Sequence, residues 1–261
     1  METVRKSAVA GAFYPADADA LSRVVKAFLE GADATAPAPK GMIVPHAGYA
    51  YSGPIAASAY ACLKKEPDRF ERVVLLGPSH FVPFEGLAFP KVDFFSTPLG
   101  RIPIDHDVLA ATNRMKALVG FNAAHRQEHS LEVQLPFLQS ILPSFKLVPL
   151  VVGEAESDDV AACLEALWGG DETLILVSSD LSHYHDDETA KRMDEKTSKH
   201  IVQFQPEAIR PEDACGHVPL RGFLVAARRF GMTARVIDLR NSGDTSGPGD
   251  SVVGYGAFLF R

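Results

Sequence analysis

The stretch that decides the fold runs Met42-Ile-Val-Pro-His-Ala-Gly-Tyr-Ala-Tyr-Ser-Gly53. A short apolar run ends at Pro45, a histidine follows directly, and a loop of small and aromatic residues comes next. In open α/β sheets, ligands bind in the loops just past the strand ends. We therefore expect a buried strand over residues 41–44 and a metal site that includes His46.

Three later stretches repeat this arrangement. Apolar residues 73–76 precede Gly77-Pro-Ser-His80, residues 174–177 precede Ser178-Ser-Asp-Leu-Ser-His183, and residues 236–239 precede Asn241-Ser-Gly-Asp-Thr-Ser-Gly247. Helix-like segments separate these runs, and strands that alternate with helices are typical of α/β proteins. We expect one domain over residues 1–261, with a central, mostly buried β-sheet flanked by helices.

The periodicity of apolar residues and the positions of proline and glycine give the expected elements. The expected helices cover residues 17–30, 54–63, 105–117, 128–142, 157–168, 187–204 and 216–230. Pro54 suits a first helical position, whereas Pro136 should kink or split its helix. The expected strands cover residues 41–44, 72–76, 147–152, 174–177, 235–239 and 252–260, with short strands between 87 and 104.

Composition excludes several classes of function. The net charge of −7 argues against a nucleic-acid or anionic-membrane partner, because both require a basic face. The sequence has neither a Walker A motif nor a GxGxxG after its first strand, so nucleotide binding has no support.

Cysteine usage and hydropathy bear on the compartment. The chain has three cysteines and no CxxC pair, which favours a reducing environment over a disulfide framework. No apolar run approaches the roughly 18 residues that a membrane span requires. We expect a cytoplasmic protein that does not bind a membrane.

His46 and His80 are the first candidates for metal ligands. They follow two successive predicted strands, which are usually neighbours in a sheet and about 5 Å apart. Both imidazole rings could then reach one ion. The alternative is that each histidine only caps the loop after its strand.

Asp180 and His183 add a carboxylate and a third imidazole in one short loop. Two histidines and one carboxylate are the ligand set of non-haem Fe(II) oxygenases, and zinc sites use similar groups. Alternatively, Asp180 forms an Asx turn and His183 faces water.

Glu128 and His129 open the helix expected over residues 128–142. His129 could act there as a general acid or base, with Glu128 or Glu132 orienting it. The alternative is a glutamate that stabilises the helix dipole beside a surface histidine. The loop over residues 241–247 could bind an anion, complete the metal site or form a plain surface turn.

The remaining histidines and the cysteine before a predicted helix are expected to have no functional role. Cys215-Gly216 could stabilise a thiolate at that helix start, but we expect a buried, inert cysteine. The histidines in this group are His106, His125, His200 and His217.

Six ordered motifs together resemble the Memo family (mediator of cell motility). They are Ala8-Val-Ala-Gly-Ala-Phe-Tyr-Pro15, Pro45-His-Ala-Gly-Tyr-Ala-Tyr-Ser-Gly53, Leu76-Gly-Pro-Ser-His80, Glu128-His-Ser-Leu-Glu-Val-Gln-Leu-Pro136, Ser178-Ser-Asp-Leu-Ser-His183 and Ser242-Gly-Asp-Thr-Ser-Gly247. They span nearly the whole chain, and the last motif is typical of bacterial and archaeal members. The family is similar in fold to the class III extradiol dioxygenases, which are non-haem Fe(II) enzymes.

The resemblance implies roles for particular residues. His46 and His80 match the two metal-binding histidines of the dioxygenases, His129 resembles their acid/base histidine, and His183 resembles their second active-site histidine. Asp180 matches a residue that lines the pocket in Memo proteins. The pocket is expected to include three further residues: Tyr51, Glu128 and Thr245.

The sequence departs from the dioxygenases at the third ligand. They complete their triad with a glutamate near the C-terminus, where animal Memo proteins place a cysteine, and this chain has Asp244 and Thr245. Threonine is a poor Fe(II) ligand, so either Asp180 or Asp244 supplies the anionic ligand or the metal is weakly held. We expect Fe(II), with Zn and Cu as the alternatives.

The resemblance leads to three hypotheses of function. The first is an Fe(II)-dependent oxidoreductase of dioxygenase type that acts on an unidentified small molecule. The second is a non-catalytic metal- or ligand-binding protein in signalling, and the third is a zinc hydrolase. Bacterial relatives are associated with radical-SAM proteins and AMMECR-type domains, so the resemblance implies partners of these kinds.

Overall fold

Four parallel strands form the centre of the larger sheet in the computed structural model, which describes residues 2–112 and 115–261. In sheet order they are β2 (Gly41–Val44), β9 (Thr173–Ser178), β3 (Arg72–Pro78) and β8 (Lys146–Val152). Apart from the first residues of β3 and β8, every residue of these strands is buried. Runs of Val, Leu and Ile explain this, because a parallel sheet is covered on both faces.

Antiparallel pairings extend the sheet on both sides, so it is mixed. Beyond β2 lies β12 (Val252–Phe260), which pairs with β11 (Ala234–Asn241) and with β10 (His183–His185). Beyond β8 lie β4 (Leu87–Phe89) and β7 (Leu118–Gly120). A separate small sheet contains β1 (Val4–Arg5), β5 (Phe94–Thr97) and β6 (Gly100–Pro103).

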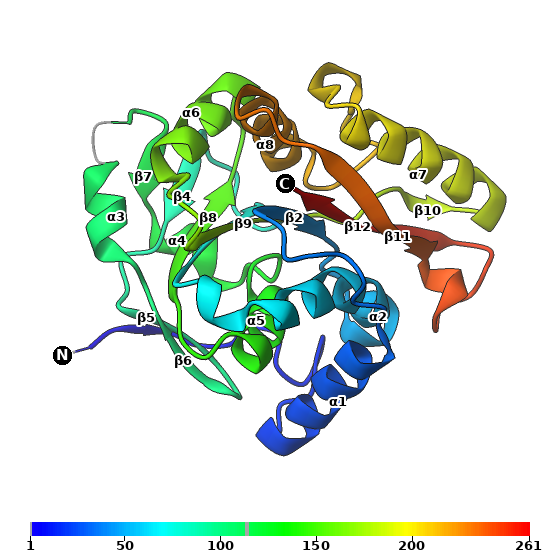
Figure 1. The fold of residues 1–261 in the computed structure, drawn as a ribbon, viewed down its shortest axis with the longest axis horizontal. Helices are drawn as coiled ribbons and strands as arrows, with labels where there is room; N and C mark the ends of the chain where they lie inside the picture. Colours follow the sequence, from blue (N-terminus) through cyan, green and yellow to red (C-terminus); the bar gives the residue numbers. More distant parts are fainter. Residues whose placement is uncertain (1, 113–114) are drawn as a thin grey trace.

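Helices cover both faces of the large sheet (Figure 1). One face carries α2 (Tyr49–Tyr60) and α5 (Leu135–Ile141), with α1 (Ala18–Gly31) packed on both. The other carries α6 (Ser157–Leu167), α8 (His217–Arg229) and α7 (Asp187–Val202). The short helices are α3 (His106–Ala111), α4 (Asn122–Arg126), η1 (Ala61–Lys65), η2 (Pro67–Arg69), η3 (Glu132–Gln134), η4 (Pro206–Ala208) and η5 (Ser242–Asp244).

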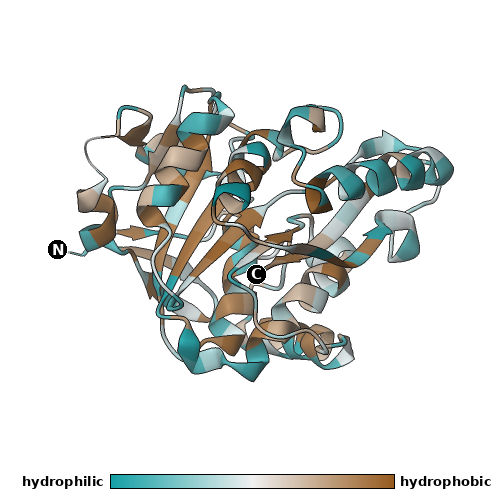
Figure 2. Cartoon of the chain, turned by 45° about the horizontal axis from the view of Figure 1, so that its top comes forward, coloured by the Kyte–Doolittle hydropathy of each residue, from teal (hydrophilic) through white to brown (hydrophobic). Residues whose placement is uncertain are grey.

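The hydropathy of the chain follows these layers. In Figure 2 the central strands are brown and the outer surface of α7 is largely teal, as expected where one helix face meets water. The buried apolar side chains form one continuous cluster that includes both faces of the sheet. The predicted α/β fold with a central sheet flanked by helices is confirmed.

Several element predictions are confirmed and one neighbour relation is wrong. β2 and β12 have the predicted bounds. However, β2 and β3 are not adjacent, because β9 lies between them and pairs with both. All six residues of β9 are buried, as expected of a strand with a parallel neighbour on each side.

The prediction for Pro54 is also wrong, because α2 begins at Tyr49 and Pro54 lies inside the helix. Proline has no N–H to donate to the carbonyl four residues before it, which is that of Ala50. The hydroxyl of Ser246 donates to this carbonyl instead, over 2.9 Å. The loop after β11 thereby supplies the hydrogen-bond donor that Pro54 lacks.

Two other predicted helices are shorter than expected. In the segment 128–142, Glu128 and His129 lie in a loop, and α5 begins only at Leu135 with Pro136 in its first turn. Pro136 lies in that first turn, where a proline leaves no intrahelical hydrogen bond unmade, and the short helix η3 directly precedes it. The helix predicted over 105–117 is α3 alone, and its residues 113 and 114 lie outside the described residues.

No helix in the described part of the chain has the length and apolar character needed to cross a membrane.

Candidate metal centre

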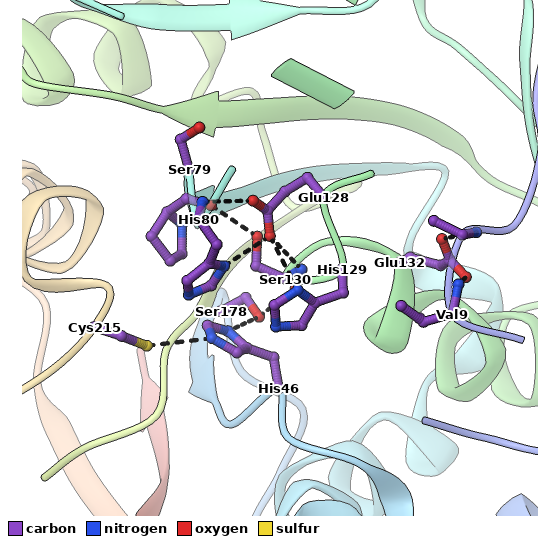
Figure 3. Close-up of polar contacts among 12 residues, drawn as sticks. Val9, His46, Ser79, His80, Glu128, His129, Ser130, Glu132, Ser178 and Cys215 are labelled. Carbon is purple, nitrogen blue, oxygen red and sulfur yellow. Dashed lines mark hydrogen bonds and ion pairs between the residues drawn. The ribbon is translucent and has the colours of Figure 1, made fainter. Parts of the chain in front are cut away.

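The carboxyl ends of two central strands and the loop before η3 bring three of the predicted histidines together. His46 follows β2 and His80 follows β3, while His129 comes from the loop before η3. The ring centroid of His46 lies 5.2 Å from that of His80 and 5.5 Å from that of His129. His80 and His129 stack at 4.6 Å. The shared site therefore forms across the intervening strand β9 (Figure 3).

Ser178, the last residue of β9, fixes the tautomer of His46. Its hydroxyl lies 2.9 Å from His46 Nδ1 and donates its one hydrogen to the carbonyl of Ser130. The hydroxyl oxygen must therefore accept from His46 Nδ1–H, as it does from the side-chain amide of Gln134 at 2.8 Å. Nδ1 of His46 carries the proton, and Nε2 keeps a free lone pair.

Glu128 does the same for His80. Its carboxylate accepts from His80 Nδ1 at 2.8 Å and from the His80 backbone N–H at 2.7 Å. Burial raises the pKa of Glu128, but hydrogen bonds from His80 and Ser130 outweigh this and lower the pKa to about 2. An ionised carboxylate only accepts hydrogen bonds, so Nδ1 of His80 carries a hydrogen and Nε2 is the ring nitrogen left for an ion. Such carboxylate–imidazole pairs orient metal ligands.

The thiol of Cys215 completes the group, against expectation. Its Sγ lies 3.2 Å from His46 Nε2 (Figure 3), and donor atoms of His46, His80 and Cys215 lie within 4.8 Å of one another. Cys215 is half-buried, not buried as predicted. The one sequence signal was a cysteine just before a helix start, and nothing linked it to a histidine 169 residues away.

The donor set fits a transition-metal ion. Burial lowers the pKa of His46 to about 3, so its imidazole is neutral, as a ligand must be. Burial raises the pKa of the Cys215 thiol, and the nearby Asp180 carboxylate adds to this effect. The thiol is therefore protonated until a cation displaces its hydrogen. Two imidazoles and a thiolate suit Fe, Zn or Cu better than Mg or Ca.

His129 differs from the two ligand histidines. Burial and the neighbouring His46 lower its pKa to about 4, and its buried Nδ1 has no hydrogen-bond partner among the described residues. The nearest carboxylate oxygen is that of Glu128, at 3.6 Å. The predicted orienting role of Glu128 is therefore wrong for His129, since Glu128 binds His80. Glu132 instead binds the N-terminal arm.

A pocket of about 420 Å³ lies beside His129, and we call it the histidine pocket. Its lining includes the predicted residues His129, Asp180, His183 and Tyr51. His183 Nδ1 donates to the carbonyl of Leu181 at 2.8 Å, which leaves its Nε2 free. Asp180 accepts from the His46 backbone N–H at 2.7 Å, and burial raises the pKa of its carboxyl.

Comparison with known proteins decides the family. A family model described as "Memo-like protein" matches residues 5–259. The chain belongs to the Memo-like family. A MEMO1 family protein of Saccharolobus islandicus (strain M.14.25 / Kamchatka #1) is 34% identical, with 98% of this chain and 99% of that protein covered. A MEMO1 family protein of Methanosarcina mazei is 34% identical, with 98% of each chain covered.

Among solved structures, an uncharacterized protein from Escherichia coli K12 is similar to this Memo-like chain at 10% sequence identity and a TM-score of 0.48. The similarity covers 84% of this chain and 98% of the other.

The anionic candidates near the C-terminus of the Memo-like chain lie apart from the ligand group. Asp244 Oδ2 accepts from the Asn241 backbone N–H at 2.9 Å, and Oδ1 lies 3.6 Å from Lys191 Nζ. Thr245 donates its hydroxyl to the carbonyl of Ser242. Within the described residues, neither Asp244 nor Asp180 joins a group of metal donors.

Proposed function

We propose that this Memo-like protein binds one transition-metal ion, Fe(II), through His46, His80 and Cys215. We further propose that it is an oxidoreductase of dioxygenase type that acts on a small molecule in the histidine pocket. One observation carries the metal proposal: the Nδ1–H of each imidazole is bonded to a neighbour, which leaves the two Nε2 atoms, beside the Cys215 thiol, as the ring nitrogens that can bind an ion.

The surrounding residues suit proton transfer. A bound ion would supply Lewis acidity and redox chemistry beside the histidine pocket. His129 is neutral at pH 7, because its pKa is about 4, and can accept a proton from a hydroxyl of the bound molecule. His183, on the loop after β9, can play the same role through its Nε2, since its Nδ1 donates to the carbonyl of Leu181. Tyr51 and Tyr255 add aromatic side chains to the lining of this pocket.

The thiol supports a second candidate function. A thiolate in place of the carboxylate of the Fe(II) oxygenases is equally suited to Zn or Cu. The same residues would then hold a metal without turnover, as a binding or metal-handling protein, or would activate water as a zinc hydrolase.

One experiment separates these functions. The protein is purified without oxygen from a metal-replete host, bound metal is measured, and O2 uptake is followed with catechols and related aromatic diols. About one iron per chain with O2 consumption supports the oxidoreductase proposal. The variant His46→Ala is expected to lose both the metal and the activity, while His129→Ala should keep the metal and lose turnover.

The exposed His106 offers a matched control, because His106→Ala removes an imidazole remote from the ligand group. Full metal occupancy without turnover would favour the binding function. Protein that carries no stoichiometric metal would overturn the metal proposal itself.

A further inference from the structure

Two separate pockets adjoin the ligand group. Besides the histidine pocket, a second pocket of about 250 Å³ is lined by His80, Cys215, His217, Phe81, Val218 and Glu154, among others, and we call it the thiol pocket. Among the described residues, none lines both pockets. The thiol pocket therefore contains two of the three proposed ligands, whereas the proton-transfer residues line the other pocket.

The ligand group is open toward the thiol pocket. His46 is buried and lines neither pocket. By contrast, 28% of the His80 side chain is exposed, and Cys215 is half-buried. A cation in the thiol pocket can thus meet His80 and the thiol directly, and both lie close to His46 Nε2.

An acidic hollow leads to the thiol pocket. Glu154 lines the thiol pocket and also a neighbouring hollow of about 700 Å³. The other charged residues of that hollow are Glu85, Glu156, Asp159 and Lys116. Four carboxylates against one ammonium make the hollow electronegative, and such a surface raises the local concentration of cations.

His217 is a further candidate donor beside Glu154 and Cys215 in the thiol pocket. It lines the thiol pocket two residues from Cys215, and its Nδ1 lies 3.3 Å from the carbonyl of Ala214. A carbonyl accepts, so Nδ1 carries the hydrogen and Nε2 keeps its lone pair. His217 can therefore bind a passing metal ion, although it is not part of the three-donor group.

We propose that the thiol pocket is the route by which a metal ion reaches His46, His80 and Cys215. Glu154 and His217 bind the cation in transit, and the histidine pocket is left to the organic molecule. The chemical class of the ligand is a hydrated divalent transition-metal cation. This route rests on the metal binding proposed above, and it assigns the two pockets to different ligands.

The route is tested by the kinetics of Co(II) uptake into the metal-free full-length chain under anaerobic conditions. The thiolate-to-Co(II) absorption band reports coordination by Cys215. Val218→Trp narrows the thiol pocket, and Ser251→Trp places the same side chain at the histidine pocket. We expect Val218→Trp to slow association and chelator-driven release about tenfold each, because an obstructed path slows both directions. The dissociation constant of Val218→Trp should stay at the wild-type value, because both rates change by the same factor. The association and release rates of Ser251→Trp should also equal those of the wild type.

A charge variant tests the route without filling the pocket. Glu154→Lys should slow Co(II) association about tenfold at low salt, an effect that shrinks as salt is raised. Glu66→Lys, an exposed change remote from the pocket, should leave the rate unchanged. If Val218→Trp no longer binds Co(II) at equilibrium, Glu154→Lys decides, and a wild-type rate for it overturns the route.

The remaining outcomes separate the two proposals. Wild-type rates in Val218→Trp, or slowing in Ser251→Trp instead, overturn the route while metal binding stands. Wild-type protein that takes up no Co(II) overturns both.

Discussion

The protons on the two ligand imidazoles are set by their protein neighbours. Ser178 accepts from His46 and Glu128 accepts from His80, so each ring is already oriented with Nδ1 toward its protein partner and Nε2 left for an ion. A preorganised donor avoids the cost of reorienting a ring on binding. The residues behind the ligands therefore contribute to affinity without touching the ion.

Replacing Glu128 tests this contribution. Glu128→Gln removes the charge that holds His80, with little change in side-chain size, and should weaken Co(II) or Zn(II) binding about 10- to 100-fold. Isothermal titration of the metal-free protein measures the change. Glu66→Gln is the matched control on the exposed surface. Equal affinities in both variants would show that the carboxylate plays no part in metal binding.

His125 gives a pH prediction away from the ligand group. Burial lowers its pKa from 6.5 to about 4 in the folded protein, so the unfolded chain takes up the proton first as the pH falls. The stability that neutral His125 contributes is thus present above pH 6.5 and is lost as the pH falls toward 4. One such proton changes the free energy of unfolding by roughly 1.4 kcal/mol per pH unit.

The variant His125→Gln should flatten the pH dependence of stability by about one proton over that window, because glutamine does not titrate. Urea unfolding of metal-free protein at several pH values between 7 and 4.5 provides the measurement. Parallel pH profiles for the two proteins would contradict the assignment.

At the scale of elements, the N-terminal arm forms one wall of the site. Glu132 accepts from the backbone N–H groups of Ala8 and Val9 at 2.7 and 3.0 Å, and it also binds Arg5 and Tyr14. These bonds carry the arm to the histidine pocket, where the Phe13 ring lies 4.8 Å from that of His129. The fully buried Glu132 thus links the arm to the loop of His129.

Removing the Glu132 carboxylate should lower the free energy of unfolding. Glu132→Gln leaves Arg5 buried without an ionised partner, and loss of one member of a buried ion pair costs about 3–5 kcal/mol. The matched change Glu30→Gln breaks an exposed pair with Lys26, for which we expect less than about 1 kcal/mol. Urea midpoints measure both. A loss below about 1 kcal/mol in Glu132→Gln would contradict this role.

Local sequence patterns predict helices and strands well only where no distant residue competes for the same polar groups. The apolar runs of β2 and β12 gave correct bounds, because a buried strand flanked by turns has few alternatives. The segment 128–142 has a helical stripe of buried leucines, yet residues 128–131 are not helical, since the carboxylate of Glu128 binds the backbone N–H of the distant His80. Propensity has no access to partners so far along the chain.

At the scale of the whole molecule, strand order determines which residues meet. The proximity of His46 and His80, the two candidate ligands, was predictable from their strand ends, but the insertion of β9 between their strands was not. That insertion brings Ser178 under His46 and the loop of Asp180 to the pocket. Cys215 reaches the group only through the packing of the segment before α8, which no local pattern encodes. Chain order therefore predicted the site in part and missed its thiol.

Because the three donors come from segments far apart in sequence, a bound ion should stabilise the whole fold. An ion that binds only the folded state adds about 2.7 kcal/mol at a concentration of 100 times its dissociation constant. For a chain of this size that corresponds to a rise in Tm of roughly 5–10 °C. Differential scanning fluorimetry with Co(II) or Zn(II), reversed by a chelator, measures it. Cys215→Ser should keep the metal-free Tm and lose most of the rise, because the hydroxyl replaces the thiolate with a poorer ligand. If Cys215→Ser and His46→Ala both show the same rise in Tm as the wild-type protein, the metal stabilises the protein from some other position.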